Sequence, residues 1–436
     1  MNRRFGLLGL PLALLLSACG SSGGGNDILD ENQLYAYRSD SPYATVLKDC
    51  ALAKEIVDTC TLQTLPFIAQ QNPEFTKADI MNRVLVTHDW MGERFEALLN
   101  DAPEKMFQLF GSLTSISIGS TVRPSYYWAG TGGIRLDPAD LWLTVAEKAN
   151  VSAEEDYRSG FGDELQFWFF ETLRNGNQAA VNYYSLSDDS ERPYEDIKVP
   201  MYRLLYHELA HAVDYLPAES IPSLNASMNP AQALTANETF FLSPRMYNDM
   251  PLNSQVLDEL SQVSFRGGEA TEAQKSYQPD FLGSEMANDG ASRYYGYSTQ
   301  REDFATLFAV ALMKLDFNLD SYVGFVNKPA NLENYYCSEL LVGWGQKNRL
   351  ADALVHTRAK WVLEQVYGQR EEFDNFFVSN ATQLQAMVPG VNWCDNRDNN
   401  YSADLPFSDE SKIGLSDAQK TEAMRRLEFE RRVRIH

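Results

Sequence analysis

The chain contains the pentapeptide His207-Glu208-Leu209-Ala210-His211, and this motif restricts the local fold more than any other part of the sequence. Histidines four positions apart project from one face of a helix, one turn from each other. Pro200 is suited to the first turn of such a helix, because a first-turn residue needs no N–H partner. We therefore predict a helix starting at Pro200, with two imidazoles aimed at one point beside an apolar stripe of Leu205, Leu209, Ala212, Val213 and Leu216.

Two imidazoles at this spacing are typical ligands of Zn²⁺. With one carboxylate added, His207 and His211 leave a fourth zinc position open for a water molecule, which the metal acidifies. Glu208 lies on the same side of the helix and can accept the proton of that water. The sequence has only five histidines in 436 residues, so the motif is expected by chance on the order of 0.01 times. It therefore predicts Zn²⁺ as the cofactor and Glu208 as the general base.

A second helix is predicted to supply the third ligand, Glu302. Ser298 or Thr299 can cap this helix, and its buried stripe is formed by Phe304, Phe308, Ala311, Leu312 and Leu315. A carboxylate held between two packed helices needs a partner, and a zinc ion is suited to that role. Two alternatives stay open: Glu302 belongs only to a capping box with Thr299, or Asp303 is the ligand in its place.

Together these residues resemble the gluzincin zinc metallopeptidases typified by the catalytic domain of anthrax lethal factor. The resemblance rests on His207-Glu-Leu-Ala-His-Ala-Val-Asp214, on Tyr295-Gly, and on Glu302-Asp-Phe-Ala-x-x-Phe308. It implies an α+β, mainly helical, zincin-like domain with a small mixed sheet beside the motif helix. It also implies zinc ligation by His207, His211 and Glu302, with Glu208 as the base. Tyr295, seven residues before the third ligand, would stabilise the transition state.

The sequence departs from the family pattern at position 306. Thr306 stands where the family often has an acidic residue that supports a zinc-bound histidine. Support is therefore expected from Asp214 or Asp303. Tyr294 and Tyr297 compete with Tyr295 for the transition-state role, and only the register of Tyr295 to Glu302 favours it.

The N-terminus has the features of a bacterial lipoprotein. Two arginines precede an apolar stretch that is too short to span a bilayer, and Leu16-Ser17-Ala18-Cys19 resembles a lipobox. The resemblance implies that residues 1–18 are a signal peptide and that Cys19 carries a lipid; an ordinary secretory signal is the alternative. Residues 19–42 would form a flexible tether. We expect a lipid-anchored protein of the cell envelope, and Gly20 favours the outer membrane.

The remaining chain is divided into three regions. Residues 43–110 are predicted to be helical, and residues 111–367 to form the catalytic domain. Residues 368–436 are predicted to be a C-terminal region that ends in a basic run, 425–434, read as a solvated helix or tail. In the helical region, one helix face is expected to carry Ile80, Val84, Leu85 and His88, the last as a partly buried residue and not as a ligand.

Within the catalytic domain, alternation and glycines predict extended segments at 114–122 and 125–138. Helices are expected over 139–172. Residues 217–237 and 264–289 are expected to be loops over the active-site face. The strand Thr131–Arg135 is expected to pair with an extended peptide.

Four cysteines remain besides Cys19, and an even number in an exported chain indicates two disulfides. We expect Cys50 to pair with Cys60 and Cys337 with Cys394. Zinc binding by these thiols is disfavoured, because none of them has the short C-x-x-C spacing.

The formal net charge of -23 argues against nucleic acid as a partner, because it offers no basic surface to a polyphosphate. The predicted function is zinc-dependent hydrolysis of peptide or protein substrates, in the envelope or outside the cell. One alternative is a catalytically inactive zincin-like lipoprotein that binds a partner in the envelope. Another is a zinc hydrolase acting on a non-protein envelope polymer, which ranks lower because no carboxylate pair for sugar chemistry is evident.

Overall fold

The computed structural model describes residues 28–399, except 185, 187–188, 333–334 and 382. The expected signal peptide, Cys19, the first part of the tether and the basic run 425–434 lie outside the described residues. Within the described residues, no helix combines the length and the apolar character that crossing a bilayer requires.

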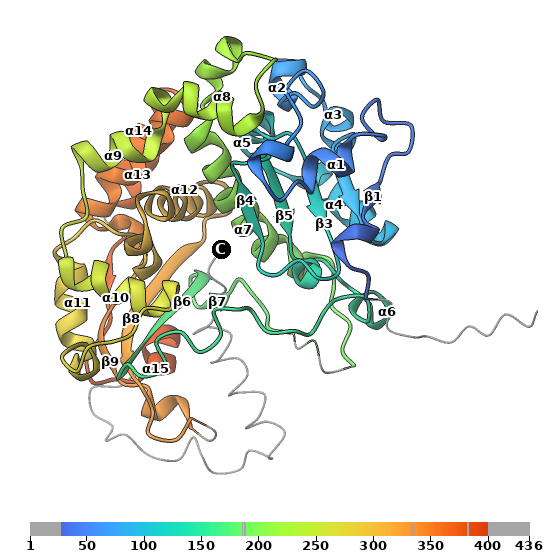
Figure 1. Ribbon diagram of the computed structural model, residues 1–436. Coiled ribbons are helices and arrows are strands. Elements are labelled where there is room, and N and C mark those ends of the chain that lie inside the picture. Colours follow the sequence, from blue (N-terminus) through green and yellow to red (C-terminus); the bar gives the residue numbers. More distant parts are fainter. Residues whose placement is uncertain (1–27, 185, 187–188, 333–334, 382, 400–436) are drawn as a thin grey trace, which may run out of the picture.

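The described chain is of mixed α and β structure, and its first sheet, sheet A, is built by the N-terminal third (Figure 1). Its strand order is β1-β2-β3-β5-β4; the three inner strands are parallel and both edge strands run antiparallel. The strands β3, β4 and β5 confirm the predicted extended segments. The bounds are Tyr35–Ala36 (β1), Val84–Val86 (β2), Ile116–Ile118 (β3), Tyr126–Trp128 (β4) and Gly133–Leu136 (β5).

Helices come before, between and after the strands of sheet A: α1 (Leu47–Ala51), α2 (Ile68–Gln71), α3 (Lys77–Met81), α4 (Asp89–Asp101), α5 (Glu104–Leu109) and α6 (Val145–Lys148). Of these, α1 contacts β1 and α4 contacts β2. The predicted helix face through Val84 and Leu85 is wrong, because these residues form the strand β2. Val84, Leu85 and Val86 are fully buried between neighbouring strands, an environment that suits β-branched side chains. His88 is the residue directly before α4 and is partly buried, as expected of a non-ligand.

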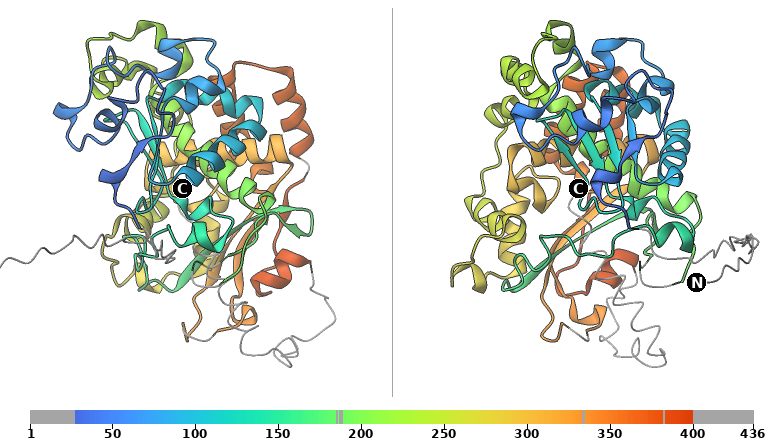
Figure 2. Two further views of the ribbon diagram at one scale, coloured as in Figure 1. Left: turned by 90° about the vertical axis from the view of Figure 1, so that its right-hand side faces the viewer. Right: turned by 45° about the vertical axis from the view of Figure 1, so that its right-hand side comes forward.

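A second sheet, sheet B, lies apart from sheet A in Figure 1 and in both views of Figure 2. It is antiparallel, with the order β10-β9-β8-β6-β7. The prediction of helices over 139–172 is wrong for most of this range: residues 149–166 form turns and irregular structure, and β6 starts at Phe167. The aromatic residues of β6 alternate between two buried faces, which is a strand pattern. The bounds are Phe167–Asn175 (β6), Gln178–Ala179 (β7), Asp320–Asn327 (β8), Val342–Lys347 (β9) and Gln385–Ala386 (β10).

Two long helices, α7 (Glu195–Tyr215) and α12 (Gln300–Phe317), pack against each other at the centre of the molecule. The helix α7 also contacts β4 and β5, and both helices share one core with sheet A. Pro200 lies inside α7 and not at its start. The preceding turn is held by buried Ile197 and by ion pairs of Lys198 with Glu195 and Asp101, so the helix begins before the proline.

The segments 217–237 and 264–289, expected to be loops, contain short helices. Between α7 and α12 the chain forms η5 (Ala218–Ser223), α8 (Pro230–Ala236), α9 (Leu242–Asp249), α10 (Gln255–Arg266), α11 (Pro279–Ala287) and η8 (Tyr294–Ser298). Asn229 caps α8, and Pro279 lies in the first turn of α11, so polar and proline residues mark helix starts here. After β9 come α13 (Ala353–Tyr367), α14 (Glu371–Asn380) and α15 (Trp393–Asp398).

Both expected disulfides are present: Cys50–Cys60 lies beside sheet A, and Cys337–Cys394 joins the segment before β9 to α15. Their sequence separations are 10 and 57 residues. A crosslink that closes the longer loop removes more entropy from the unfolded chain, about 4 kcal/mol against about 3 kcal/mol for the shorter.

We expect the double variant C337S/C394S to lose more unfolding free energy than C50S/C60S, with both less stable than the wild type. Urea unfolding followed by circular dichroism measures the difference. A C337S/C394S protein as stable as the wild type would contradict this expectation.

Candidate metal centre

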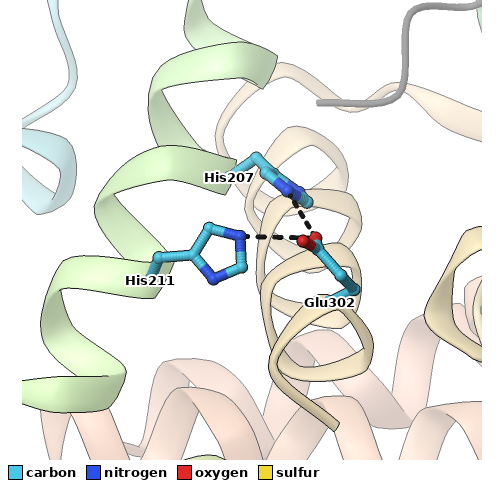
Figure 3. A group of neighbouring side chains, drawn as sticks. All are labelled: His207, His211 and Glu302. Carbon is cyan, nitrogen blue, oxygen red and sulfur yellow. Dashed lines mark hydrogen bonds and ion pairs between the residues drawn. The ribbon is translucent and has the colours of Figure 1, made fainter. Parts of the chain in front are cut away.

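The packing of α7 on α12 brings three predicted ligands together (Figure 3). The two histidines come from successive turns of α7, and Glu302 comes from the first turn of α12. An Oε2–Nε2 distance of 3.1 Å joins Glu302 to His207, and one of 3.3 Å joins it to His211. One ligand atom from each residue lies within 4.8 Å of the others, so the three can hold a single metal ion.

The start of α12 decides between the two roles considered for Glu302. Thr299 is the N-cap, and its hydroxyl accepts a hydrogen bond from the backbone N–H of Glu302 at 3.1 Å. The Glu302 carboxylate does not return to the cap but faces the two histidines. Capping by Thr299 therefore fixes the backbone of Glu302 and leaves its side chain for the site.

The three groups form one electrostatic unit. Burial alone would raise the pKa of Glu302, but His211 and His207 hold it well below its usual range. Burial lowers the pKa of His207 to about 4, despite its hydrogen bond to Glu302. For His211, burial lowers the pKa, but the charge and hydrogen bond of Glu302, together with the charges of Glu208 and Asp214, raise it to about 9. One carboxylate thus attracts positive charge to a point between two imidazoles, where a cation can take the place of a proton.

Glu208 lies beside this unit and is only 3% exposed. Burial raises its pKa to about 7, and the backbone N–H of Tyr127 donates a hydrogen bond to the carboxylate. Tyr127 belongs to β4, one of the two edge strands of sheet A. The predicted base therefore lies between the motif helix and a strand edge.

The expectation that Thr131–Arg135 pairs with a peptide is wrong. These residues lead into β5, which is hydrogen-bonded to β3 on one side and to β4 on the other. An inner strand has no free edge for another chain. In this part of sheet A, the strand with a partner on one side only is β4.

Among the three competing tyrosines, only Tyr295 faces the metal ligands. Its ring centroid lies 6.4 Å from that of His207, and its hydroxyl hydrogen-bonds to Glu302. Burial and the Glu302 carboxylate raise its pKa well above the usual value, so the phenol keeps its proton. Tyr294 instead bonds to the hydroxyl of Ser264 at 3.1 Å, and Tyr297 donates to Asp289 at 3.2 Å.

Asp303 is not placed as a ligand. Its carboxylate pairs with the buried Arg358, one contact being 3.0 Å. Asp214, the other candidate for support, accepts hydrogen bonds from the backbone of Leu242 and Ser243 and pairs with Arg301.

Asp214 and Asp303 were expected to support a ligand histidine, but within the described residues neither forms a hydrogen bond with His207 or His211. Asp214 acts on His211 only through its charge. The buried Nδ1 of His207 has no hydrogen-bond partner within the described residues.

Two further charged groups near the site were missed by sequence reasoning. Glu171, on β6, pairs with Arg203 at 3.0 Å and with Arg293 at 2.6 Å, and all three side chains are largely buried. Arg203 lies one turn before His207 on α7, and Arg293 immediately precedes η8. The four-residue spacing from Arg203 to His207 indicates that both lie on one face of the helix, so Arg203 could have been placed near the site from the sequence. Its partner Glu171 could not, because it lies on a distant strand.

The other missed group is Arg158, between α6 and β6. Its charge acts on both Glu208 and Tyr295, lowering the pKa of each against the larger effect of burial. No periodicity or motif in the sequence marks this residue as part of the site.

Comparisons with known proteins give no match to any family model, curated protein or solved structure. Any function for this chain therefore has to be argued from its own residues. The strongest grounds are the convergence of His207, His211 and Glu302 and the buried carboxylate of Glu208 beside them.

Proposed function

We propose that this chain is a zinc-dependent peptidase of the gluzincin type with a zincin-like fold. The observation that carries the proposal is the convergence of His207, His211 and Glu302 on one point, with Glu208 next to it. Ligand atoms at about 2.0–2.2 Å from a tetrahedral zinc ion lie roughly 3.3–3.6 Å apart. The distances of 3.1 and 3.3 Å from Glu302 to the two imidazoles are close to that spacing.

Two other observations support a catalytic metal over a purely structural one. The ligand set is two histidines and one carboxylate, which leaves a fourth position for solvent or substrate. The Glu302 side chain is 18% exposed and that of His211 12%, so solvent reaches the ligands. A closed structural site would instead have four protein ligands.

Each residue then has a defined task in peptide hydrolysis. Zinc, when bound, supplies the acidity that activates a water molecule and polarises the scissile carbonyl. Glu208 accepts the proton of that water at its carboxylate and returns it to the leaving amine, and its burial next to the histidines places it for this exchange. Tyr295 keeps its proton and donates a hydrogen bond to the developing oxyanion.

The strand β4 supports a peptide as the substrate. It pairs with β5 on one side only, and the Tyr127 N–H that donates to Glu208 comes from this strand. An extended peptide added along this edge would pass beside the base. With the lipid anchor proposed at Cys19, the enzyme would act on peptides in the envelope or outside the cell.

The proposal is tested with the zinc-loaded protein, a chelator-treated sample and a peptide library, with cleavage products read by mass spectrometry. New termini that appear only with zinc are expected. Bound zinc without cleavage of any peptide would favour the alternative function, a catalytically inactive lipoprotein that binds a partner in the envelope. In a parallel incubation with a non-protein envelope polymer, the release of products would instead favour a zinc hydrolase that acts on such polymers.

The role of Tyr295 gives a prediction of its own. Replacing Tyr295 by Phe should lower kcat about 10²-fold, because one donor to the oxyanion is removed while the ring stays. Zinc content and KM should change little. Tyr294→Phe is the matched control, since its hydroxyl bonds to Ser264, and it should keep wild-type kcat. Equal kcat in both variants would remove Tyr295 from the mechanism.

A further inference from the structure

A buried cluster of ion pairs joins three elements around the candidate metal centre. The carboxylate of Glu171, on β6, pairs through Oε2 with Arg203 at 3.0 Å and with Arg293 at 2.6 Å. The exposed fractions of these three side chains are 3%, 12% and 5%. Ser321, on the neighbouring strand β8, donates to the other oxygen, Oε1, at 3.4 Å. One acidic side chain thus anchors two cations to sheet B.

Each of the two arginines is connected to the site through the backbone. Arg203 precedes His207 by four positions on α7, so both lie on one face of the helix. Side chains of an α-helix lean toward its N-terminus, so the imidazole of His207 lies over the turn that carries Arg203. Arg293 directly precedes η8, and Tyr295 is the second residue of η8. A shift of either arginine would therefore move a residue of the site.

Glu171 lies at the border of two hydrophobic cores. Residues two positions apart on a strand share a face, so Phe169 and Leu173 flank Glu171 on the same side of β6. Phe169 packs with Tyr294 of η8, with ring centroids 5.8 Å apart, whereas Leu173 belongs to the core that α7 shares with sheet A. Apolar packing is non-directional, but an ion pair of a guanidinium with a carboxylate has a defined geometry. The two ion pairs can therefore set the relative positions of α7 and η8.

Stability alone does not account for this cluster. Two guanidiniums share one carboxylate, so the cluster carries one excess positive charge in a buried place. Burial of charge is costly, and replacing a buried ion pair by well-packed apolar side chains is often neutral or stabilising. The excess charge also opposes the binding of a cation nearby. The defined geometry of the contacts is the remaining benefit.

His207 depends on such a geometry. A metal-bound histidine is usually oriented by a hydrogen bond from its second ring nitrogen. The buried Nδ1 of His207 has no such partner within the described residues. The orientation of the imidazole therefore follows from the position of α7 itself, and the turn that carries Arg203 is the part of α7 over which this ring lies.

We propose that Glu171 is a positioning residue of the site. Through Arg203 it holds the turn of α7 beside His207, and through Arg293 it holds the segment that carries Tyr295. The inference deepens the proposed function and rests on it for the zinc ion and for the role of Tyr295. Glu171 acts through the two arginines and has no contact of its own with the metal or the substrate.

Two substitutions separate the effect of position from the effect of charge. Arg203→Met and Arg293→Met each remove one positive charge from the cluster and leave the other arginine paired with Glu171. The remaining ion pair is neutral, and methionine fills much of the space of the arginine stem. Loss of charge alone would strengthen zinc binding in both variants. Loss of position should weaken zinc binding in Arg203→Met only, because only this arginine lies on the helix of the two histidines.

We expect the zinc Kd of Arg203→Met to rise about tenfold, as is typical when a residue that orients a metal ligand is lost. Arg293→Met is the matched control, and its zinc Kd should not rise. Competition of the protein with a chromophoric chelator for Zn²⁺ gives the Kd. The visible absorption of the Co²⁺-loaded protein reports the coordination geometry, and it should change in Arg203→Met but not in the control.

The link to Tyr295 is measured by turnover. On a peptide that the wild type cleaves, Arg293→Met should lower kcat about tenfold, because the oxyanion donor is displaced. Glu171→Asp keeps every charge but draws the carboxylate back by one methylene group, so it should both raise the zinc Kd and lower kcat. Lys198→Met removes ion pairs from the first turn of α7 and should change neither quantity.

A zinc Kd in Arg203→Met that equals or falls below that of the wild type would overturn the inference, because only the charge of Arg203 would then act on the site. If Arg203→Met does not fold, Glu171→Asp decides, and an unchanged Kd in that variant has the same meaning. A rise of the Kd in Arg203→Met but not in Arg293→Met supports the inference even where no peptide is cleaved. A wild type that binds no zinc would overturn the proposed function, and the inference with it.

Discussion

Purified protein carrying His207→Ala or Glu302→Ala is expected to contain no stoichiometric zinc, whereas the wild type is expected to bind one zinc ion per chain. Each substitution removes one of three converging ligands and leaves two. Inductively coupled plasma mass spectrometry after dialysis measures the metal directly. Zinc at a thousandfold excess over its Kd should stabilise the wild type by about 4 kcal/mol, so its melting temperature rises with zinc and those of the variants do not.

The chain offers a matched control for the loss of a histidine. His356 lies on α13, partly buried against Phe377, and is no member of the ligand group. His356→Ala should therefore keep full zinc content. Full zinc in the Glu302→Ala protein would show that Glu302 is no zinc ligand and that its contacts in Figure 3 are only those of a hydrogen-bonded cluster.

The second large effect is expected from Glu208→Gln, which should lower kcat about 10³-fold while zinc remains bound. Glutamine keeps the shape of the side chain and can still accept the Tyr127 N–H, but it cannot take a proton from water. Single-turnover cleavage of a peptide found in the library experiment gives the rate, and metal analysis of the same sample gives the zinc content.

Glu147→Gln is the control for this substitution. It neutralises another partly buried carboxylate, which lies on α6 and pairs with Arg94 of α4. It should retain wild-type turnover. A Glu208→Gln protein that turns over within tenfold of the wild type would remove Glu208 from the mechanism and leave the leaving-group proton without a donor.

The ligand geometry could be predicted because it follows from local rules. The spacing of His207 and His211 on one helix is fixed by the helical repeat, and Thr299 marks the start of the helix that carries Glu302. Both disulfides were expected from an even number of cysteines, each paired with its nearest neighbour in the sequence. The helix spacing and the cap need only short-range information, whereas the meeting of Glu302 with His207, 95 residues away, does not follow from it.

Other features depended on contacts between distant parts of the chain. Sheet B joins strands from residues 167–179 with strands that follow α12, and nothing near Phe167 in the sequence announces those partners. The start of α7 was misplaced because Ile197, before the proline, is buried in the core shared with sheet A, which the local sequence does not reveal. The roles of Arg158, Arg203 and Glu171 appear only when three separate elements meet.

His207 and Glu302 are 95 residues apart along the chain, yet the helices that carry them touch directly. The intervening residues fold mainly as the separate short helices α8 to α11. Insertions or deletions between those helices would reshape the surroundings of the candidate metal ligands while the spacing of the donor atoms stayed the same. Changes in α8 to α11 would therefore alter which molecules such a protein recognises, without a change in the pair of helices α7 and α12.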